Sequence, residues 1–203
     1  MLYWWPTLDD HKKILNIINK EYPLDDDNYS KYIDKFYNYN SSIAYAISTL
    51  TKNLNIEGIL YVECGNCLYL DSFIGLKQPV LGISSNELSD KYALAYNLQK
   101  YYQHLDITNK MEVNDTFGMV LIINGSISNT LYKSKNAINY ISKLTNRYIL
   151  IIEDKKNFEE KEVLSSFVES FISRGFKLNC LCDTKFSDKK MSETYTFFLE
   201  RPY

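Results

Sequence analysis

Polar residues that could bind a ligand follow several short apolar runs of the sequence. The first run leads into Glu63-Cys64-Gly65-Asn66-Cys67, and later runs lead into Ser84, Asp106 and Asn124. Carboxylate, hydroxyl and amide groups form directional hydrogen bonds, and a glycine such as Gly65 lets backbone approach a ligand closely. If the runs are neighbouring strands of an open α/β sheet, these loops gather at the ligand-binding edge.

Cys64 and Cys67 form a Cys-x-x-Cys pair, which suggests two other kinds of chemistry. A dithiol at a helix N-terminus would hold a reactive thiolate, but the chain lacks a proline at a suitable later strand start and is long for a thioredoxin-like fold. Together with Cys180 and Cys182 the pair would supply the four ligands of a structural zinc. Because Cys180 and Cys182 fall on a late strand, we expect buried reduced thiols and no metal site.

From residue 58 onward, apolar runs alternate with helical stretches, a pattern typical of βαβ units around a mostly parallel sheet. The expected strands span 58–63, 79–83, 104–107, 119–124, 148–153, 176–183 and 194–200. Helices are expected just after residue 67 and over 87–102, 131–144 and 159–174, with Gly175 as the C-terminal cap of the last one. Residues 1–50 are predicted to be a helical extension or lid, and 51–203 a single domain.

Over residues 43–201 the sequence resembles the class I S-adenosylmethionine-dependent methyltransferases. Residues 62–67 resemble the acid-x-Gly-x-Gly loop that holds the methionine and ribose parts of the cofactor, and 105–108 resemble the adenine-binding loop. Residues 114–121 are similar to the strand entry that follows. The resemblance implies a three-layer Rossmann-like α/β fold with a seven-stranded, mostly parallel sheet and an antiparallel last strand.

The resemblance also implies which residues meet S-adenosylmethionine. Asp106 would accept a hydrogen bond from the adenine amino group, the Ile107 N–H would meet a ring nitrogen, Ser84 would accept from a ribose hydroxyl, and Asn124 would face the methyl acceptor. The full cofactor-binding set is Glu63, Gly65, Cys67, Ser84, Asp106, Ile107 and Asn124.

Three positions depart from the family pattern. Cys67 stands at the second glycine, Ser84 stands where an acid usually ends the second strand, and Gly118 replaces an aspartate. Ser84-x-x-Glu87 is also a capping box that would begin the next helix. In the same way, Asp106 suits a turn cap, and Asn124-Gly125 suits a tight turn.

Catalytic residues are harder to assign, since methyl transfer from a sulfonium depends mainly on alignment of the reacting atoms. Asn124 and His104 are the candidates, and a structural role is the alternative for each. The aromatic residues at 3–5 and the tyrosines between 29 and 39 suit either a lid over the site or the core.

Composition restricts the partners and the compartment. A net charge of −2 over 203 residues, without a basic stripe, disfavours nucleic acid. No apolar run is long enough to cross a membrane, and no secretory signal opens the chain, so we expect a cytoplasmic protein.

The expected function is methyl transfer to a small-molecule or protein acceptor. The alternative is an inactive methyltransferase-like binding or regulatory subunit, and a homodimer or a partner subunit stays open.

Overall fold

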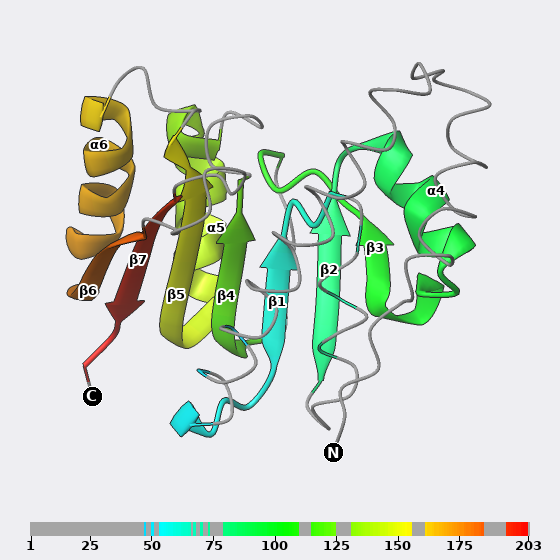
Figure 1. Ribbon diagram of the computed structural model, residues 1–203, viewed down its shortest axis with the longest axis horizontal. Helices are drawn as coiled ribbons and strands as arrows, with labels where there is room; N and C mark the ends of the chain where they lie inside the picture. The colour runs from blue at the N-terminus through cyan, green and yellow to red at the C-terminus, as the bar shows by residue number, and fades with distance from the viewer. Residues whose placement is uncertain are drawn as a thin grey trace.

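The computed structural model describes residues 47, 50, 53–65, 67, 70, 73, 79–109, 115–124, 131–155, 161–184 and 194–202. The predicted N-terminal helices and most of the helix after residue 67 lie outside these residues. The described strands and helices are β1 (Ile59–Val62), β2 (Val80–Ser84), α4 (Glu87–Ala95), β3 (Tyr102–His104), β4 (Phe117–Ile123), α5 (Lys135–Leu144), β5 (Thr145–Asp154), α6 (Lys161–Ile172), β6 (Lys177–Thr184) and β7 (Thr194–Glu200) (Figure 1). Short 3-10 helices cover Gln99–Tyr101 and Leu131–Lys133.

The seven described strands form one sheet in the order β3-β2-β1-β4-β5-β7-β6. The first five pair in parallel, and β7 runs antiparallel to both β5 and β6. This confirms the predicted seven-stranded, mostly parallel sheet with an antiparallel last strand. The chain builds β2 and β3 on one side of β1 and then crosses to β4 on the other. Strand order therefore reverses between β1 and β4, which is where open α/β sheets bind ligands.

The central strands are buried on both faces of the sheet, as expected for parallel strands covered by helices. In β1, Ile59 and Tyr61 belong to one core cluster, and Leu60 and Val62 belong to the other. Side chains of α5 and α6 complete the second cluster, and α4 contributes to the first. Since a fully buried Leu or Ile contributes about 1.5 to 3 kcal/mol, these alternating apolar positions hold the three layers together.

The helix predicted over 87–102 is shorter than expected, because α4 ends at Ala95. Asn97 has a φ of 56°, and its N–H donates to the Leu94 carbonyl while the Leu98 N–H donates to the Ala93 carbonyl. These two bonds form a Schellman motif with Asn in the left-handed position, the usual alternative to glycine there. The prediction missed this stop because the apolar spacing continues past it.

Gly175 ends α6 as predicted. Its φ is 90°, its N–H donates to the Ile172 carbonyl, and the Phe176 N–H donates to the Phe171 carbonyl. The same Schellman motif therefore closes this helix, and the glycine adopts the left-handed conformation without the strain of a side chain.

Two further boundaries differ from the sequence prediction. The third strand covers Tyr102–His104 rather than 104–107, because the Asp106 carboxylate accepts from the Thr108 N–H and turns the chain. The helix predicted from residue 131 begins at Lys135, where the Ser134 hydroxyl accepts from the Ala137 N–H as an N-cap. Within the described residues, no helix is long and apolar enough to cross a membrane.

Candidate functional site

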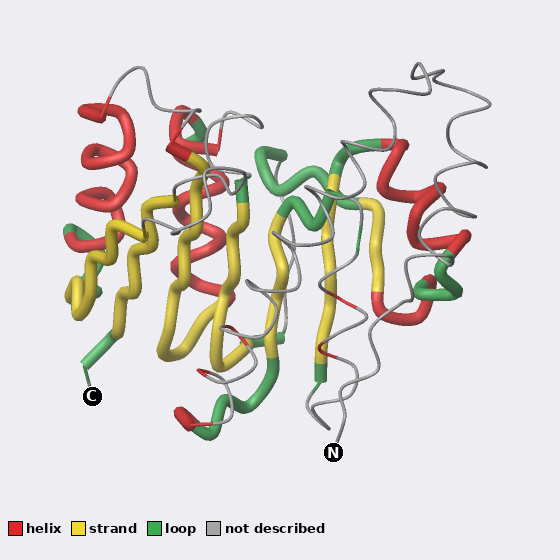
Figure 2. The backbone as a smooth tube through the Cα atoms, in the orientation of Figure 1, coloured by secondary structure: helices red, strands yellow, loops and turns green. Residues whose placement is uncertain are grey.

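The candidate site lies at the carboxyl ends of β1, β2 and β4, three neighbouring strands of the sheet whose ends lie at the same edge (Figure 2). β1 and β2 are in register up to Val62 and Ile83, so the next residues of the two strands, Glu63 and Ser84, come side by side. Asn124 follows β4, on the other side of β1. Glu63 and Asn124 both adopt a positive φ, 53° and 52°. A positive φ is uncommon for residues other than glycine, and residues with this backbone conformation are found more often at functional sites.

Glu63 is a buried carboxyl, with 5% of its surface exposed. The Ser84 hydroxyl donates to its Oε2 at 3.2 Å. Burial is the largest influence on the pKa of Glu63 and raises it, hydrogen bonds from Ser84 and Ser85 lower it in part, and the nearby charge of Asp106 raises it again. The net pKa lies above the ordinary value for glutamate. Glu63, Ser84 and Asp106 are thus brought together, as the sequence predicted.

Ser84 supports Glu63 from inside the protein. It is fully buried, and its hydroxyl accepts from the Asn86 N–H at 3.1 Å and from the Ser89 hydroxyl at 3.0 Å. The capping-box interpretation is wrong, because α4 begins at Glu87 and Asn86 precedes it. These two donors direct the Ser84 proton toward the Glu63 carboxylate.

Asp106 holds its own loop in shape. One carboxylate oxygen accepts from the Thr108 N–H at 2.9 Å and from the Thr108 hydroxyl at 2.6 Å, and the other accepts from Asn109 Nδ2 at 2.7 Å. The side chain stays partly exposed, whereas the neighbouring Ile107 is fully buried. The turn-capping interpretation is therefore correct, and it leaves the carboxylate at the surface of the site.

His104 is tied to α4. Its Nδ1 lies 3.0 Å from both Asp90 carboxylate oxygens, and the Tyr102 hydroxyl donates to Asp90 at 2.6 Å. Burial raises the pKa of Asp90, but the hydrogen bonds from Tyr102 and His104 outweigh it and hold that pKa below its ordinary value. The histidine thus joins the edge strand β3 to α4, two strands away from β1.

The two cysteines of the first loop are buried and reduced. Their Sγ atoms lie 3.8 Å apart, and both side chains have no exposed surface. The hydrogen bond between the thiols and their burial raise the pKa of Cys64 far above its usual range. A reactive dithiol needs the opposite shift, so the geometry argues against that chemistry.

A shared zinc site is ruled out for the first loop and Cys180 by their positions in the sheet. Cys180 is exposed on β6, so the prediction of a buried thiol is wrong for this residue. β4, β5 and β7 lie between β6 and β1. Among the described residues, no group of three or more His, Cys, Asp or Glu side chains is placed to hold a metal ion.

Comparison with known proteins relates this geometry to solved structures. No family model and no curated protein sequence matches the chain. Magnesium protoporphyrin IX methyltransferase (ChlM) from Synechocystis PCC 6803 with bound SAM superposes with a TM-score of 0.63 at 14% identity, over 84% of this chain and 83% of that one. An S-adenosylmethionine-dependent methyltransferase from Clostridium acetobutylicum ATCC 824 gives 0.60 at 10% identity, over 94% and 98%. The glycopeptide N-methyltransferase MtfA gives 0.62 at 13% identity, over 79% and 90%.

The fold is that of the class I methyltransferases. The sequence identities are low, which fits a divergent member of this fold group. The candidate site occupies the edge of the methyltransferase fold at which the strand order reverses.

Cys67, which stands where the resemblance predicts the second glycine of the loop, keeps a glycine-like backbone. Its φ is 59°, close to the 52° of Gly65. The Cys67 thiol points into the core, 3.6 Å from the Ser89 carbonyl oxygen and 3.7 Å from that of Gly65. Loop shape is thus preserved, and the added side chain occupies space below the loop rather than above it.

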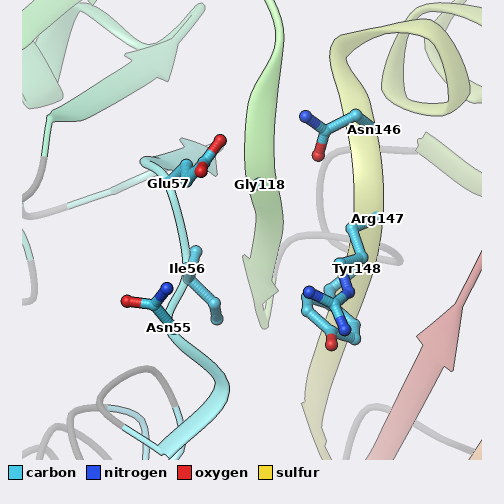
Figure 3. Close-up of a pocket in the computed structure, with 7 residues that line it drawn as sticks. All are labelled: Asn55, Ile56, Glu57, Gly118, Asn146, Arg147 and Tyr148. Atoms are coloured by element: carbon cyan, nitrogen blue, oxygen red, sulfur yellow. The ribbon is translucent and has the colours of Figure 1, made fainter.

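Gly118, which stands where the resemblance predicts an aspartate, has no room for a side chain. A Cβ atom there would lie 2.8 Å from the backbone nitrogen of Glu57 and 3.1 Å from the Ile56 side chain. The residue forms part of a cavity of about 310 Å³ that also involves Asn55, Asn146, Arg147 and Tyr148 (Figure 3). This cavity opens at the amino end of β4, the sheet edge opposite the candidate site.

Two serines of the site were not predicted as site residues from the sequence. Ser85 hydrogen bonds to the Glu63 carboxylate through its backbone and side chain, and it is exposed, unlike Ser84. Ser89 positions the Ser84 hydroxyl from the first turn of α4. The signal available was the pair Ser84-Ser85 at the end of β2, where two adjacent hydroxyls alternate between interior and surface.

Proposed function

We propose that the protein binds S-adenosylmethionine at the carboxyl edge of β1 and β2 and transfers its methyl group to a small-molecule or protein acceptor. The observation that carries this proposal is the convergence of Glu63, Ser84 and Asp106 at the reversal point of a class I methyltransferase fold. Structural neighbours crystallised with the methyl donor or its product support the choice of ligand.

The first loop is suited to close approach by a ligand. Gly65 is exposed, and among the described residues other than its chain neighbours the nearest atom to a Cβ built on it is the Glu63 carbonyl oxygen, at 4.0 Å. The left-handed backbone of Gly65 and Cys67 turns the loop across the end of β1. Backbone groups of this loop are thus accessible to the methionine part of the cofactor.

The ribose part would be bound differently from the family pattern. Ser84 is fully buried and bonded to Glu63, whereas Ser85 presents an exposed hydroxyl next to the same carboxylate. We assign the ribose contact to Glu63 and Ser85 instead of Ser84. Asp106 and the Ile107 backbone keep their proposed adenine contacts.

S-adenosylmethionine supplies a methyl group activated by a sulfonium, and the protein supplies alignment. Glu63, Gly65, Cys67 and Asp106 would hold the cofactor at the sheet edge. Asn124, beyond β4 on the acceptor side, is the proposed positioning residue for the methyl acceptor. His104 is the weaker candidate, because Asp90 holds it on the far side of β2.

Isothermal titration with S-adenosylmethionine and S-adenosylhomocysteine tests the proposal. We expect both to bind with micromolar dissociation constants, about 8 kcal/mol of binding free energy. Absence of binding at millimolar ligand would contradict the proposal.

Free Cys64 and Cys67 thiols suit a reducing compartment, and we propose the cytoplasm.

A second candidate function is binding without turnover, as an inactive regulatory subunit. The observation that favours it is the buried Ser84 in place of a surface acid at the end of β2. Tight S-adenosylhomocysteine binding without methyl transfer to any acceptor in a broad screen would support it, and methylation of an acceptor would exclude it.

Asp106→Ala is expected to weaken S-adenosylhomocysteine binding about 5- to 150-fold, equal to about 1 to 3 kcal/mol, because it strands a polar partner of the adenine. Calorimetry measures the change. The matched control is Thr108→Val, which removes one bond within the same loop and leaves the carboxylate in place. An equal loss in both variants would assign the effect to loop shape and remove Asp106 from the adenine contact.

A further inference from the structure

A β-bulge interrupts the parallel pairing of β4 with β5 at the amino end of both strands. The register shifts there, so that two residues of β5, Asn146 and Arg147, stand opposite Gly118 of β4. Bulges are rare between parallel strands, and beside binding sites they redirect side chains toward the ligand. Both residues of this bulge line the cavity of about 310 Å³ at the amino end of β4. The bulge therefore shapes this cavity.

Thr145 fixes the bulge from inside the protein. Its side chain is fully buried, and its hydroxyl donates to the Tyr148 carbonyl at 2.9 Å and accepts from the Arg147 N–H at 3.3 Å. The same hydroxyl lies 3.4 Å from the Gly118 carbonyl oxygen. One buried side chain thus ties the β5 wall of the cavity to its β4 floor, and the cavity is preformed, as sites for small ligands usually are.

The opposite wall of the cavity is the segment that leads into β1. Residues 55–57 line the cavity from this side. The Met119 N–H donates to the Gly58 carbonyl at 3.1 Å, and the backbone of Glu57 comes so close to Gly118 that a Cβ atom there would clash. A glycine within a strand often marks such a close approach. This wall is therefore also held against β4.

The two walls carry opposite charges. Glu57 extends from the wall before β1, and the Arg147 guanidinium lies over the Tyr148 ring on the β5 wall, 4.7 Å from the ring centre (Figure 3). Arg147 Nε also lies 3.8 Å from Glu200 Oε1, a longer distance than the roughly 2.7 to 2.9 Å of a charge-assisted hydrogen bond. Because a guanidinium has several N–H donors, this contact is compatible with a second carboxylate.

We propose that this cavity binds a small dipolar molecule that carries both an ammonium and a carboxylate group, of the free amino acid class. The ammonium binds Glu57, and the carboxylate binds Arg147. The amides of Asn55 and Asn146, each a donor and an acceptor, contact both groups. A ligand with a single charge would leave the wall of like charge without a complementary partner.

The size and the position of the cavity agree with this ligand class. Small-molecule pockets begin near about 300 Å³, and Asn55, Glu57 and Asn146 are exposed, so solvent and ligand reach the cavity. It lies at the sheet edge opposite Glu63. The inference therefore goes beyond the proposed methyltransferase function and does not depend on it.

Isothermal titration of the full chain with L-alanine, L-leucine and L-glutamine, each alone at up to about 10 mM, tests the site. We expect at least one of them to bind with a dissociation constant of about 1 mM or lower. For that amino acid, the analogue without the ammonium group and the analogue without the carboxylate should each bind about tenfold or more weakly, since each loses one charged contact.

Variants place the binding in this cavity. Glu57→Gln is expected to weaken the amino acid about tenfold or more. The matched control is Glu162→Gln, at an exposed glutamate in the first turn of α6, which should leave the affinity unchanged. An amino acid also resembles the methionine part of S-adenosylmethionine, so the titration is repeated with saturating S-adenosylhomocysteine, which should not displace it.

Three results overturn the proposal: none of the three amino acids binds, Glu57→Gln binds as tightly as Glu162→Gln, or S-adenosylhomocysteine displaces the amino acid. If S-adenosylhomocysteine itself does not bind, the methyltransferase proposal fails, and the comparison of Glu57→Gln with Glu162→Gln still decides whether the cavity is an amino acid site.

Discussion

Gly118→Asp is expected to lower the free energy of unfolding by about 3 kcal/mol or more, because it both overpacks the strand and buries a carboxylate. The clashing atom at 2.8 Å is the backbone nitrogen of Glu57, which cannot swing aside as the end of a flexible side chain would. Gly118 is buried at the start of β4, between the segment before β1 and β5. Urea unfolding followed by circular dichroism measures the loss.

Two companion variants separate the causes. Gly118→Ala overpacks the strand without burying a carboxylate. We expect it to lower the free energy of unfolding by about 1 to 3 kcal/mol. Asp115→Ala, in the exposed residues just before β4, is the control and should change stability by less than about 0.5 kcal/mol. If Gly118→Ala is as stable as Asp115→Ala, the close approach of the Glu57 backbone does not constrain this position.

At position 118 the family resemblance and the local packing favour different residues. The run of apolar residues predicted the strand that contains it, and the Phe117–Ile123 strand confirms that prediction. The resemblance predicts an aspartate at position 118, and nothing in the local sequence explains the glycine there. The explanation is a contact with Glu57, some sixty positions earlier in the chain, and contacts between distant segments leave no local pattern.

The elements that could be predicted are those whose signal lies within a few residues. Fully apolar runs predicted β1 and β4, and Gly175 predicted the end of α6. Asn97 was missed as a helix end because asparagine adopts the left-handed conformation less readily than glycine and carries a weaker signal. Residues 1–50 remain a predicted helical extension, since the structure describes only two of them.

In the candidate site, residue types were predictable and their orientations were not. Glu63 and Asp106 were correctly placed at one edge of the sheet, since register and strand order follow from the βαβ pattern. Whether Ser84 or Ser85 faces solvent depends on the pleat at the last residue of β2, where a shift of one residue exchanges interior and surface. Likewise, Cys67 directs its side chain away from the ligand edge through a φ that the sequence does not specify.

Glu63→Gln is expected to weaken S-adenosylhomocysteine binding about 5- to 150-fold, or about 1 to 3 kcal/mol, since it replaces a carboxylate at the ligand edge with a neutral amide. Calorimetry at pH 7 measures this change. Ser89→Ala is the matched control, because it removes a hydrogen bond to the Ser84 hydroxyl while leaving Glu63 and its Ser84 contact in place. An equal loss in the two variants would show that loosening of the hydrogen-bond network is the cause.

The same substitution is expected to change how stability depends on pH, and the direction follows from the raised pKa of Glu63. Because the folded state holds the proton more tightly than the unfolded state, the wild type loses stability as pH rises from the ordinary glutamate pKa through the folded-state value. Glu63→Gln removes this loss, so the stability of the variant relative to wild type should increase over that interval and stay constant above it. Urea unfolding at a series of pH values measures the difference, and a difference that does not vary with pH would show that the carboxyl is not perturbed. If both results are obtained, Glu63 lowers stability and strengthens ligand binding, which would fit a residue placed for function rather than for folding.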